Sequence, residues 1–223
     1  MKTLLLSLLL AVSAFNVQAQ PVTASTDLLE LPPALPFETS PWATVVFTNQ
    51  TDNAIDVYGL GANGPFGFDW ECSGGGNVEL PPRGTCVLSV RFEGGEGQPL
   101  GVIDGLVGFR LSTGTVLVDL RAFTYAPMAP FGVRNLRSSL IPLGFDLELV
   151  QTLDARLSAV ETLLADASAA NDRRACGQLQ FFEQRVLQEA AHDRVRDWSA
   201  AVLVVQKDAM WLNLHCGGPW RNQ

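Results

Sequence analysis

The sequence has little of what catalytic sites are usually built from. It contains two histidines, His192 and His215, and neither stands at a metal-ligand spacing from other ligand types. No nucleophile elbow, phosphate-binding P-loop or dinucleotide-binding glycine motif occurs. The sequence therefore predicts a protein that is not an enzyme and that has no cofactor and no metal site.

Positive charge is also scarce. The chain has 15 Lys and Arg against 23 Asp and Glu, a formal net charge of −8, and no basic run. This balance argues against nucleic acid and anionic membrane surfaces as partners. Acidic residues are concentrated in the first half, because residues 21–126 contain 12 of them and only 4 basic ones.

Long apolar runs are missing after the N-terminus, so no membrane span is expected in the mature chain. Residues 1–19 have Lys2, an apolar run at 4–15 and small residues ending at Ala19, which predicts a signal peptide cleaved after Ala19. An uncleaved N-terminal anchor is the alternative. We expect a secreted or periplasmic protein, in which four cysteines form two disulfides with three possible pairings.

What the sequence does contain is a change of composition near residue 126. Before it come β-branched residues, glycine and proline in short alternating runs, and after it come Leu, Ala, Gln and Arg at helical spacing. The prediction is an antiparallel immunoglobulin-like β-sandwich of six or seven strands followed by a small antiparallel α-helical bundle. The expected boundaries are an extended lead-in at 20–36, the sandwich at 37–125, a linker at 126–130, the bundle at 131–217 and a tail at 218–223.

The stretch 66–92 is the most informative part of the first half. Phe66, Phe68 and Trp70 alternate with polar residues, which predicts an inward face for the three rings. A glycine turn at 74–76 and a proline–glycine turn at 81–84 lead to a second alternating strand. Cys72 and Cys86 flank these turns, so a bond between them would close a short loop worth roughly 3 kcal/mol.

This half resembles the Hydin-type immunoglobulin-like domains of secreted bacterial proteins over about 37–124. The residues that carry the resemblance are VVFTNQTDNAIDVYGL, FGFDWECSG, LPPRGTCVLSVRF and LVDLRAF. At 93–100 the chain has glycines where that family has a proline-rich turn. The resemblance implies a structural or binding domain without catalysis.

In the second half, apolar residues recur at spacings of three and four. We expect a short helix at 133–140, a helix capped by Asp146, a break and cap at Asn171 and Asp172, and two further helices. The predicted stripe of the first long helix is Val150, Leu153, Leu157, Val160, Leu164 and Ala167. The second helix is expected to bury Cys176, Leu179, Phe181, Phe182 and Val186. The third is expected to bury Trp198, Val202, Val205, Ala209, Leu212 and Cys216.

If the last two helices are antiparallel, Cys176 and Cys216 lie at neighbouring ends, and a disulfide between them is geometrically natural. The helical half resembles the C-terminal FIMAH module of secreted bacterial proteins over about 131–216. Its ACxxLxxF pattern falls on Ala175, Cys176, Leu179 and Phe182. This resemblance implies an interaction module.

Candidate ligand-binding residues are few. Asp69 and Glu71 share one face of a predicted strand and could form an acidic ligand face, although such pairs are more often simply solvated. Trp42 and Trp220 could stack on sugars if exposed, or pack in the core. The predicted function is an exported binding, scaffolding or adhesion-type module whose partner is an envelope or extracellular protein or glycan. The alternative is a small secreted hydrolase or glycan-binding protein that uses the acidic and aromatic face.

Overall fold

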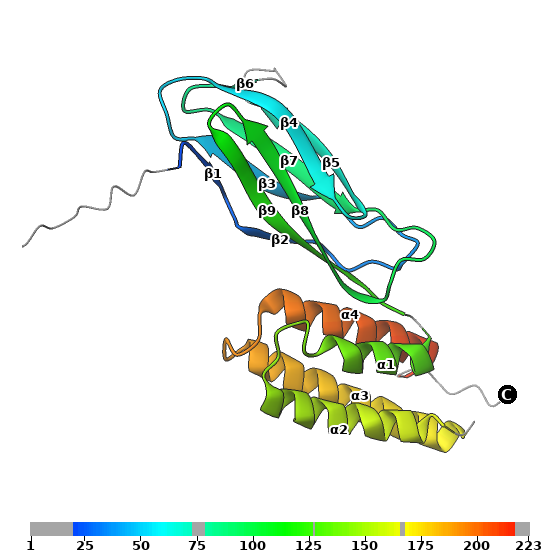
Figure 1. Cartoon of the computed structure of the whole chain (residues 1–223). Coiled ribbons are helices and arrows are strands. Elements are labelled where there is room, and N and C mark those ends of the chain that lie inside the picture. The colour runs from blue at the N-terminus through cyan, green and yellow to red at the C-terminus, as the bar shows by residue number, and fades with distance from the viewer. Residues whose placement is uncertain (1–19, 73–78, 127, 166–167, 217–223) are drawn as a thin grey trace, which may run out of the picture.

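The structure is a computed structural model, which describes residues 20–72, 79–126, 128–165 and 168–216. Several predictions fall outside these residues: the signal peptide at 1–19, the glycine turn at 74–76, Pro127 of the linker, Ala167, and the tail at 218–223 with Trp220. Within the described residues there are nine strands and four helices. The strands come first along the chain, and the helices follow (Figure 1).

The strands form two sheets that face each other. The first has the order β1 (Val22–Ala24), β3 (Ala43–Asn49), β7 (Thr85–Phe92), β5 (Phe66–Cys72). The second has the order β2 (Leu28–Glu30), β9 (Gly114–Thr124), β8 (Gly101–Leu111), β4 (Ile55–Asn63), β6 (Glu79–Leu80). All pairings are antiparallel except β2 with β9. The order β1-β3-β7-β5 opposite β9-β8-β4 corresponds to the ABED and GFC sheets of an immunoglobulin-like sandwich.

Alternation along the strands builds the core between the sheets. Phe47 of β3 and Phe109 of β8 are buried, with ring centroids 4.6 Å apart in an edge-to-face arrangement. Trp70 of β5 packs on the same Phe109 ring at 5.2 Å. The expectation that Phe68 is buried with its neighbours is wrong, because β5 is an edge strand and leaves this ring 39% exposed.

The expectation of an extended lead-in at 20–36 is also wrong. Residues 22–24 pair with β3 and residues 28–30 pair with β9, so both segments are strands of the sandwich. Leu31 is fully buried, and Ala34 forms a bridge to Thr124. Strands of three residues show too little alternation to be recognised in a proline-rich stretch, and proline is compatible with sheet edges.

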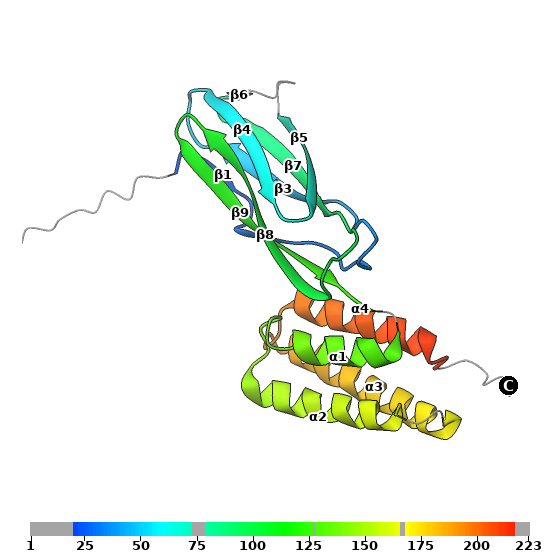
Figure 2. The ribbon, with the colours of Figure 1, turned by 45° about the vertical axis from the view of Figure 1, so that its right-hand side comes forward.

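The four helices are α1 (Ala129–Ser139), α2 (Leu147–Leu163), α3 (Ala169–Ala190) and α4 (Asp197–Asn213). In both ribbon views α1 and α4 lie beside the sandwich, while α2 and α3 lie farther from it (Figures 1 and 2). Buried side chains from all four helices share one apolar core, among them Leu136, Leu153, Phe182 and Val202. The predicted cap is present, because Asp146 Oδ1 accepts a hydrogen bond from the backbone N–H of Leu149 (2.8 Å).

Two predictions about α3 need correction. Asn171 and Asp172 do not break a helix, since α3 already begins at Ala169. Phe181 of α3 is 56% exposed.

The predicted stripe of α4 is right only in part, because Val202 and Cys216 are buried as expected but the buried face extends to other positions. Leu212 is exposed, whereas Ser199, Gln206 and Lys207 are buried. Two of the buried side chains donate to carbonyl oxygens of other segments: Ser199 Oγ donates to Leu143 O (2.8 Å) and Gln206 Nε2 donates to Gly132 O (2.9 Å). The spacing of apolar residues cannot predict a buried position that is occupied by a polar residue.

Both predicted disulfides are present. Cys72 of β5 is bonded to Cys86 of β7, its direct partner across the strand pair. Cys176 in α3 is bonded to Cys216, just beyond the end of α4. Each bond therefore lies within one half of the chain.

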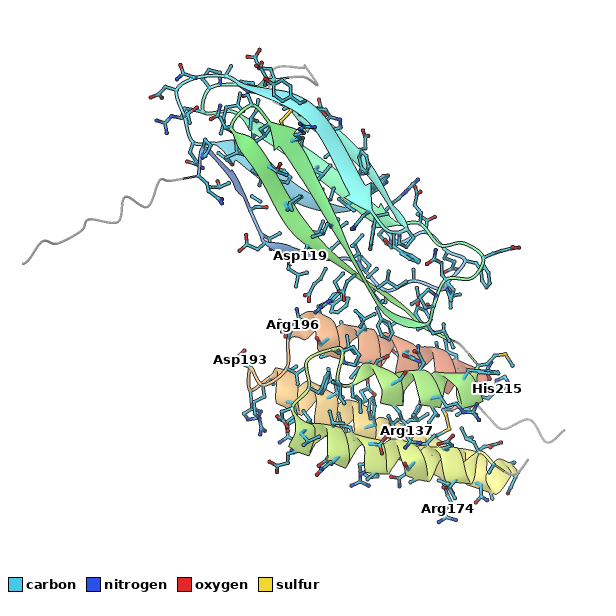
Figure 3. The ribbon with its side chains drawn as sticks, viewed as in Figure 1. Asp119, Arg137, Arg174, Asp193, Arg196 and His215 are labelled. Atoms are coloured by element: carbon cyan, nitrogen blue, oxygen red, sulfur yellow. A yellow bond between two sulfur atoms is a disulfide. The ribbon has the colours of Figure 1, made fainter. Side chains whose placement is uncertain are left out.

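The two halves meet in a continuous junction. Phe123 of β9 is fully buried in the core of the helical half. Trp198 Nε1 of α4 donates a hydrogen bond to Leu31 O (2.8 Å), and Asn135 Nδ2 of α1 donates to Thr124 O (3.2 Å). Arg196, which lies at the start of α4 on the side of the sandwich (Figure 3), pairs with Glu30 of β2. Burial raises the pKa of Glu30, and the charges of Arg196 and Arg121 offset only part of this effect.

Among the described residues, no helix has the length and apolar character needed to cross a bilayer.

Candidate ligand-binding face of the sandwich

Strand alternation and register place the candidate residues on the outer face of the β1-β3-β7-β5 sheet. Asp69 and Glu71 of β5 point away from the core and are exposed. The pairing of β5, β7 and β3 extends their positions into two cross-strand rows, Thr44–Ser89–Asp69 and Val46–Val87–Glu71. This face therefore presents hydroxyls, two valines and two carboxylates side by side.

Trp42 lies at one end of the same face. It immediately precedes β3, and the Arg91 guanidinium lies 4.4 Å from the centroid of its ring. Arg91 pairs with Gly67, so it occupies the row next to Asp69. The structure thus brings Trp42 onto the sheet face that carries Asp69 and Glu71, which the sequence could not show.

Arg91 is held on both sides. Its Nη2 forms an ion pair with Glu93 Oε1 (2.9 Å), and the Glu93 side chain lies across Gly67, where an added Cβ would meet Oε1 at 2.2 Å. A cation over an exposed ring contributes about 0.5–1 kcal/mol. This contact favours the observed position of the Trp42 ring, which remains 46% exposed.

Asp69 already has a partner within its own strand. Asp69 Oδ1 accepts a hydrogen bond from the backbone N–H of Trp70 (2.9 Å), so one carboxylate oxygen is already engaged. Two hollows, of about 310 and 240 Å³, lie in the helical half and are lined by none of these residues.

No metal site is apparent in the part of the chain that the structure describes, since no three His, Cys, Asp or Glu side chains gather there. Trp220 lies outside that part. Arg91, Ser89 and Thr44 were not among the predicted site residues. Alternation predicts an outward direction for Arg91, but its place beside Trp42 depends on the register of strands about 50 residues apart in sequence.

No family model matches the sequence, and no curated protein matches it. Solved structures resemble about half of the chain. The ASH/PapD-like domain 7 of human CEP192 is 13% identical with a TM-score of 0.35, covering 47% of this chain and 84% of that domain. A protein of unknown function from Porphyromonas gingivalis W83 is 16% identical with a TM-score of 0.39 and covers 48% of each chain. The E. coli chaperone DraB is 13% identical with a TM-score of 0.33, covering 48% of this chain and 55% of its own. We draw no functional conclusion from likenesses of this size.

Proposed function

We propose that this chain is an exported, non-enzymatic binding, scaffolding or adhesion-type module that contacts an envelope or extracellular protein or glycan. The observation that carries the proposal is the shared face of Trp42, Asp69, Glu71 and Arg91 on the β1-β3-β7-β5 sheet. Exposed aromatic and arginine side chains are the types that most often dominate binding energy at interfaces.

Export is supported by two observations. Residues 1–19 have the composition of a signal peptide, and all four cysteines are used in disulfides. We infer a secreted or periplasmic location after cleavage at Ala19. The same proposal includes two family assignments. Residues 37–124 would form a Hydin-type domain, and residues 131–216 would form a FIMAH module folded as a small antiparallel bundle.

Glycan binding is the second candidate. The exposed Trp42 ring beside the hydroxyls of Thr44 and Ser89 favours it, because sugars stack on aromatic faces and hydrogen-bond to flanking polar groups. Glycan hydrolysis by Asp69 and Glu71 has less support than glycan binding, since both carboxylates lie exposed on an open sheet.

The test measures binding of the purified protein to envelope extracts, to isolated cell-wall polysaccharide and to matched protein fractions. We expect Trp42→Ala to weaken binding about tenfold, as for a typical interface anchor. The matched control is Tyr58→Ala, which removes an exposed ring from β4 in the other sheet and should leave binding unchanged. Equal retention by both variants would contradict the proposal.

A second pair of variants addresses hydrolysis. Asp69→Asn removes a charge from the candidate face, and Asp119→Asn removes one from the exposed side of β9 in the other sheet. Release of soluble products from polysaccharide or protein that disappears only in Asp69→Asn would establish hydrolysis and overturn the non-enzymatic proposal. Unchanged or absent turnover removes that alternative.

A further inference from the structure

A second surface with binding chemistry lies between α2 and α3, in the part of the helical half farther from the sandwich (Figures 1 and 2). Side chains of these helices enclose a hollow of about 310 Å³, which we call the α2–α3 groove. Its lining includes Thr152, Leu153, Arg156, Phe181, Arg185 and Gln188. Leu153 is buried at the bottom, whereas Phe181 is 56% exposed.

Arg156 has no acidic partner in the described part of the chain. It donates a hydrogen bond from Nη1 to the neutral Gln178 Oε1 (3.2 Å), and its guanidinium lies 5.7 Å from the centroid of Phe181. Arg137 differs, since it bonds to Asp154 (2.6 Å) and Glu161 (2.7 Å) and so links α1 to α2. The charge of Arg137 is neutralised within the fold, and the charge of Arg156 is not.

Near the other end of the groove, one carboxylate is shared by two arginines. Glu189 is buried and pairs with Arg185 (2.7 Å) and Arg194 (2.6 Å). This cluster keeps a net positive charge on the side of α3 that carries Arg185. The charged residues that line the groove are all arginines, in a chain whose net charge is −8.

The arrangement specifies the chemistry of an occupant. Guanidinium groups select carboxylates, with which they form charge-assisted hydrogen bonds. An exposed phenyl ring above a buried leucine selects an apolar side chain. The surface of two packed helices receives a third helix, whose side chains enter the groove at positions i, i+3, i+4 and i+7.

We propose that the α2–α3 groove binds an acidic amphipathic helix of a partner protein, with carboxylates at Arg156 and Arg185 and an apolar side chain on Phe181. This rests on the proposed function of the chain as a binding module, and it assigns the helical half a partner of its own. Because the groove and the candidate sheet face lie on different halves, the chain could hold two partners at once.

The probe is a fluorescent helical peptide about five turns long, with leucine and glutamate on one face, and its counterpart carries lysine for glutamate. Fluorescence anisotropy is measured with the whole mature chain at low and physiological salt. We expect the acidic peptide to bind and the basic one not to bind, with weaker binding at higher salt. Absence of binding, or equal binding of both peptides, overturns the proposal.

Matched variants on the same helices locate the site. Arg156→Gln and Phe181→Ser should each weaken acidic-peptide binding about tenfold. The controls are Arg174→Gln and Leu187→Ser, which change an exposed arginine and an exposed apolar residue of α3 that do not line the groove. Equal losses in variants and controls would show nonspecific attraction and overturn the assignment. If Phe181→Ser lowers the melting temperature, its loss of binding is not interpreted, and the result for Arg156→Gln alone tests the assignment.

Two further measurements separate the possible outcomes. In the first, polygalacturonate competes with the fluorescent acidic peptide. If it displaces the probe at a lower concentration than unlabelled acidic peptide does, the occupant of the groove is an acidic polysaccharide and the proposal is overturned. Trp42→Ala should keep full peptide binding while its binding to the envelope partner weakens about tenfold. Peptide binding without envelope binding would therefore refute only the proposed function of the sheet face. Envelope binding without peptide binding would refute only the proposed role of the α2–α3 groove.

Discussion

At the scale of single residues, Asn49 connects more of the sandwich than any predicted site residue. It is buried at the end of β3, and three carbonyl oxygens surround its Nδ2: Asn53 O at 2.7 Å, Pro81 O at 2.9 Å and Leu80 O at 3.2 Å. Its Oδ1 accepts the backbone N–H of Thr51 at 2.9 Å. One amide thus holds the β3–β4 turn against the loop that leads into β7.

We expect Asn49→Asp to lower the free energy of unfolding by about 3 kcal/mol, because a carboxylate oxygen would face carbonyl oxygens without a donor between them. Asn53→Asp is the control, since the Asn53 side chain is exposed and only its backbone oxygen takes part. Its expected effect is within about 0.5 kcal/mol. Urea denaturation followed by tryptophan fluorescence measures both, and equal midpoints would refute this role for Asn49.

At the scale of elements, the sequence predicts the strands and helices whose apolar periodicity extends over enough residues to be recognised. Six strands and the capped α2 follow from alternation, turn residues and Asp146. The first two strands could not be predicted, because their stability comes from pairing with β3 and β9. The face of α4 could not be predicted either. Polar residues such as Ser199 and Gln206 are buried there through partners on other segments.

The candidate site divides in the same way. That Asp69 and Glu71 share a face follows from the two-residue period of a strand. That Trp42 joins them follows from the register of β3, β7 and β5, which local sequence does not encode. The sequence alone does not distinguish the arginines of the α2–α3 groove from other arginines on helix surfaces. Only the packing of α2 on α3 distinguishes Arg156 from the neutralised Arg137.

The two disulfides act on different elements and should differ in their contribution. Cys72 and Cys86 are 14 residues apart and join strands already held by a ladder, whereas Cys176 and Cys216 are 40 residues apart. On the chain-entropy estimate, the shorter loop stabilises by about 3 kcal/mol and the longer by about 4 kcal/mol. Paired Cys→Ala variants compared by denaturant unfolding check this order. A larger loss for the Cys72 and Cys86 pair would contradict it.

At the scale of the whole molecule, the question is whether the halves behave as one body. The junction has the composition of an interior, since Phe123 of β9 is buried among helix side chains and Trp198 of α4 reaches back to Leu31. Both contacts involve residues that are also anchored in the sandwich, because Leu31 is fully buried and β9 is a central strand. Opening the junction would expose apolar surface and leave polar groups without partners.

We therefore expect the parent protein to unfold in a single transition, with far-UV circular dichroism from the helices and tryptophan fluorescence changing together. Trp198→Ala removes both the ring and its N–H donor at the junction. It should cost about 3 kcal/mol and separate the two signals, with the helical half unfolding first. Trp198→Phe keeps most of the packing and loses only the hydrogen bond to Leu31 O, so the signals should still coincide after a loss of about 1 kcal/mol. Two transitions in the parent protein would mean that the junction does not couple the halves. A partner bound on the sandwich face would then have no mechanical connection to one bound in the α2–α3 groove.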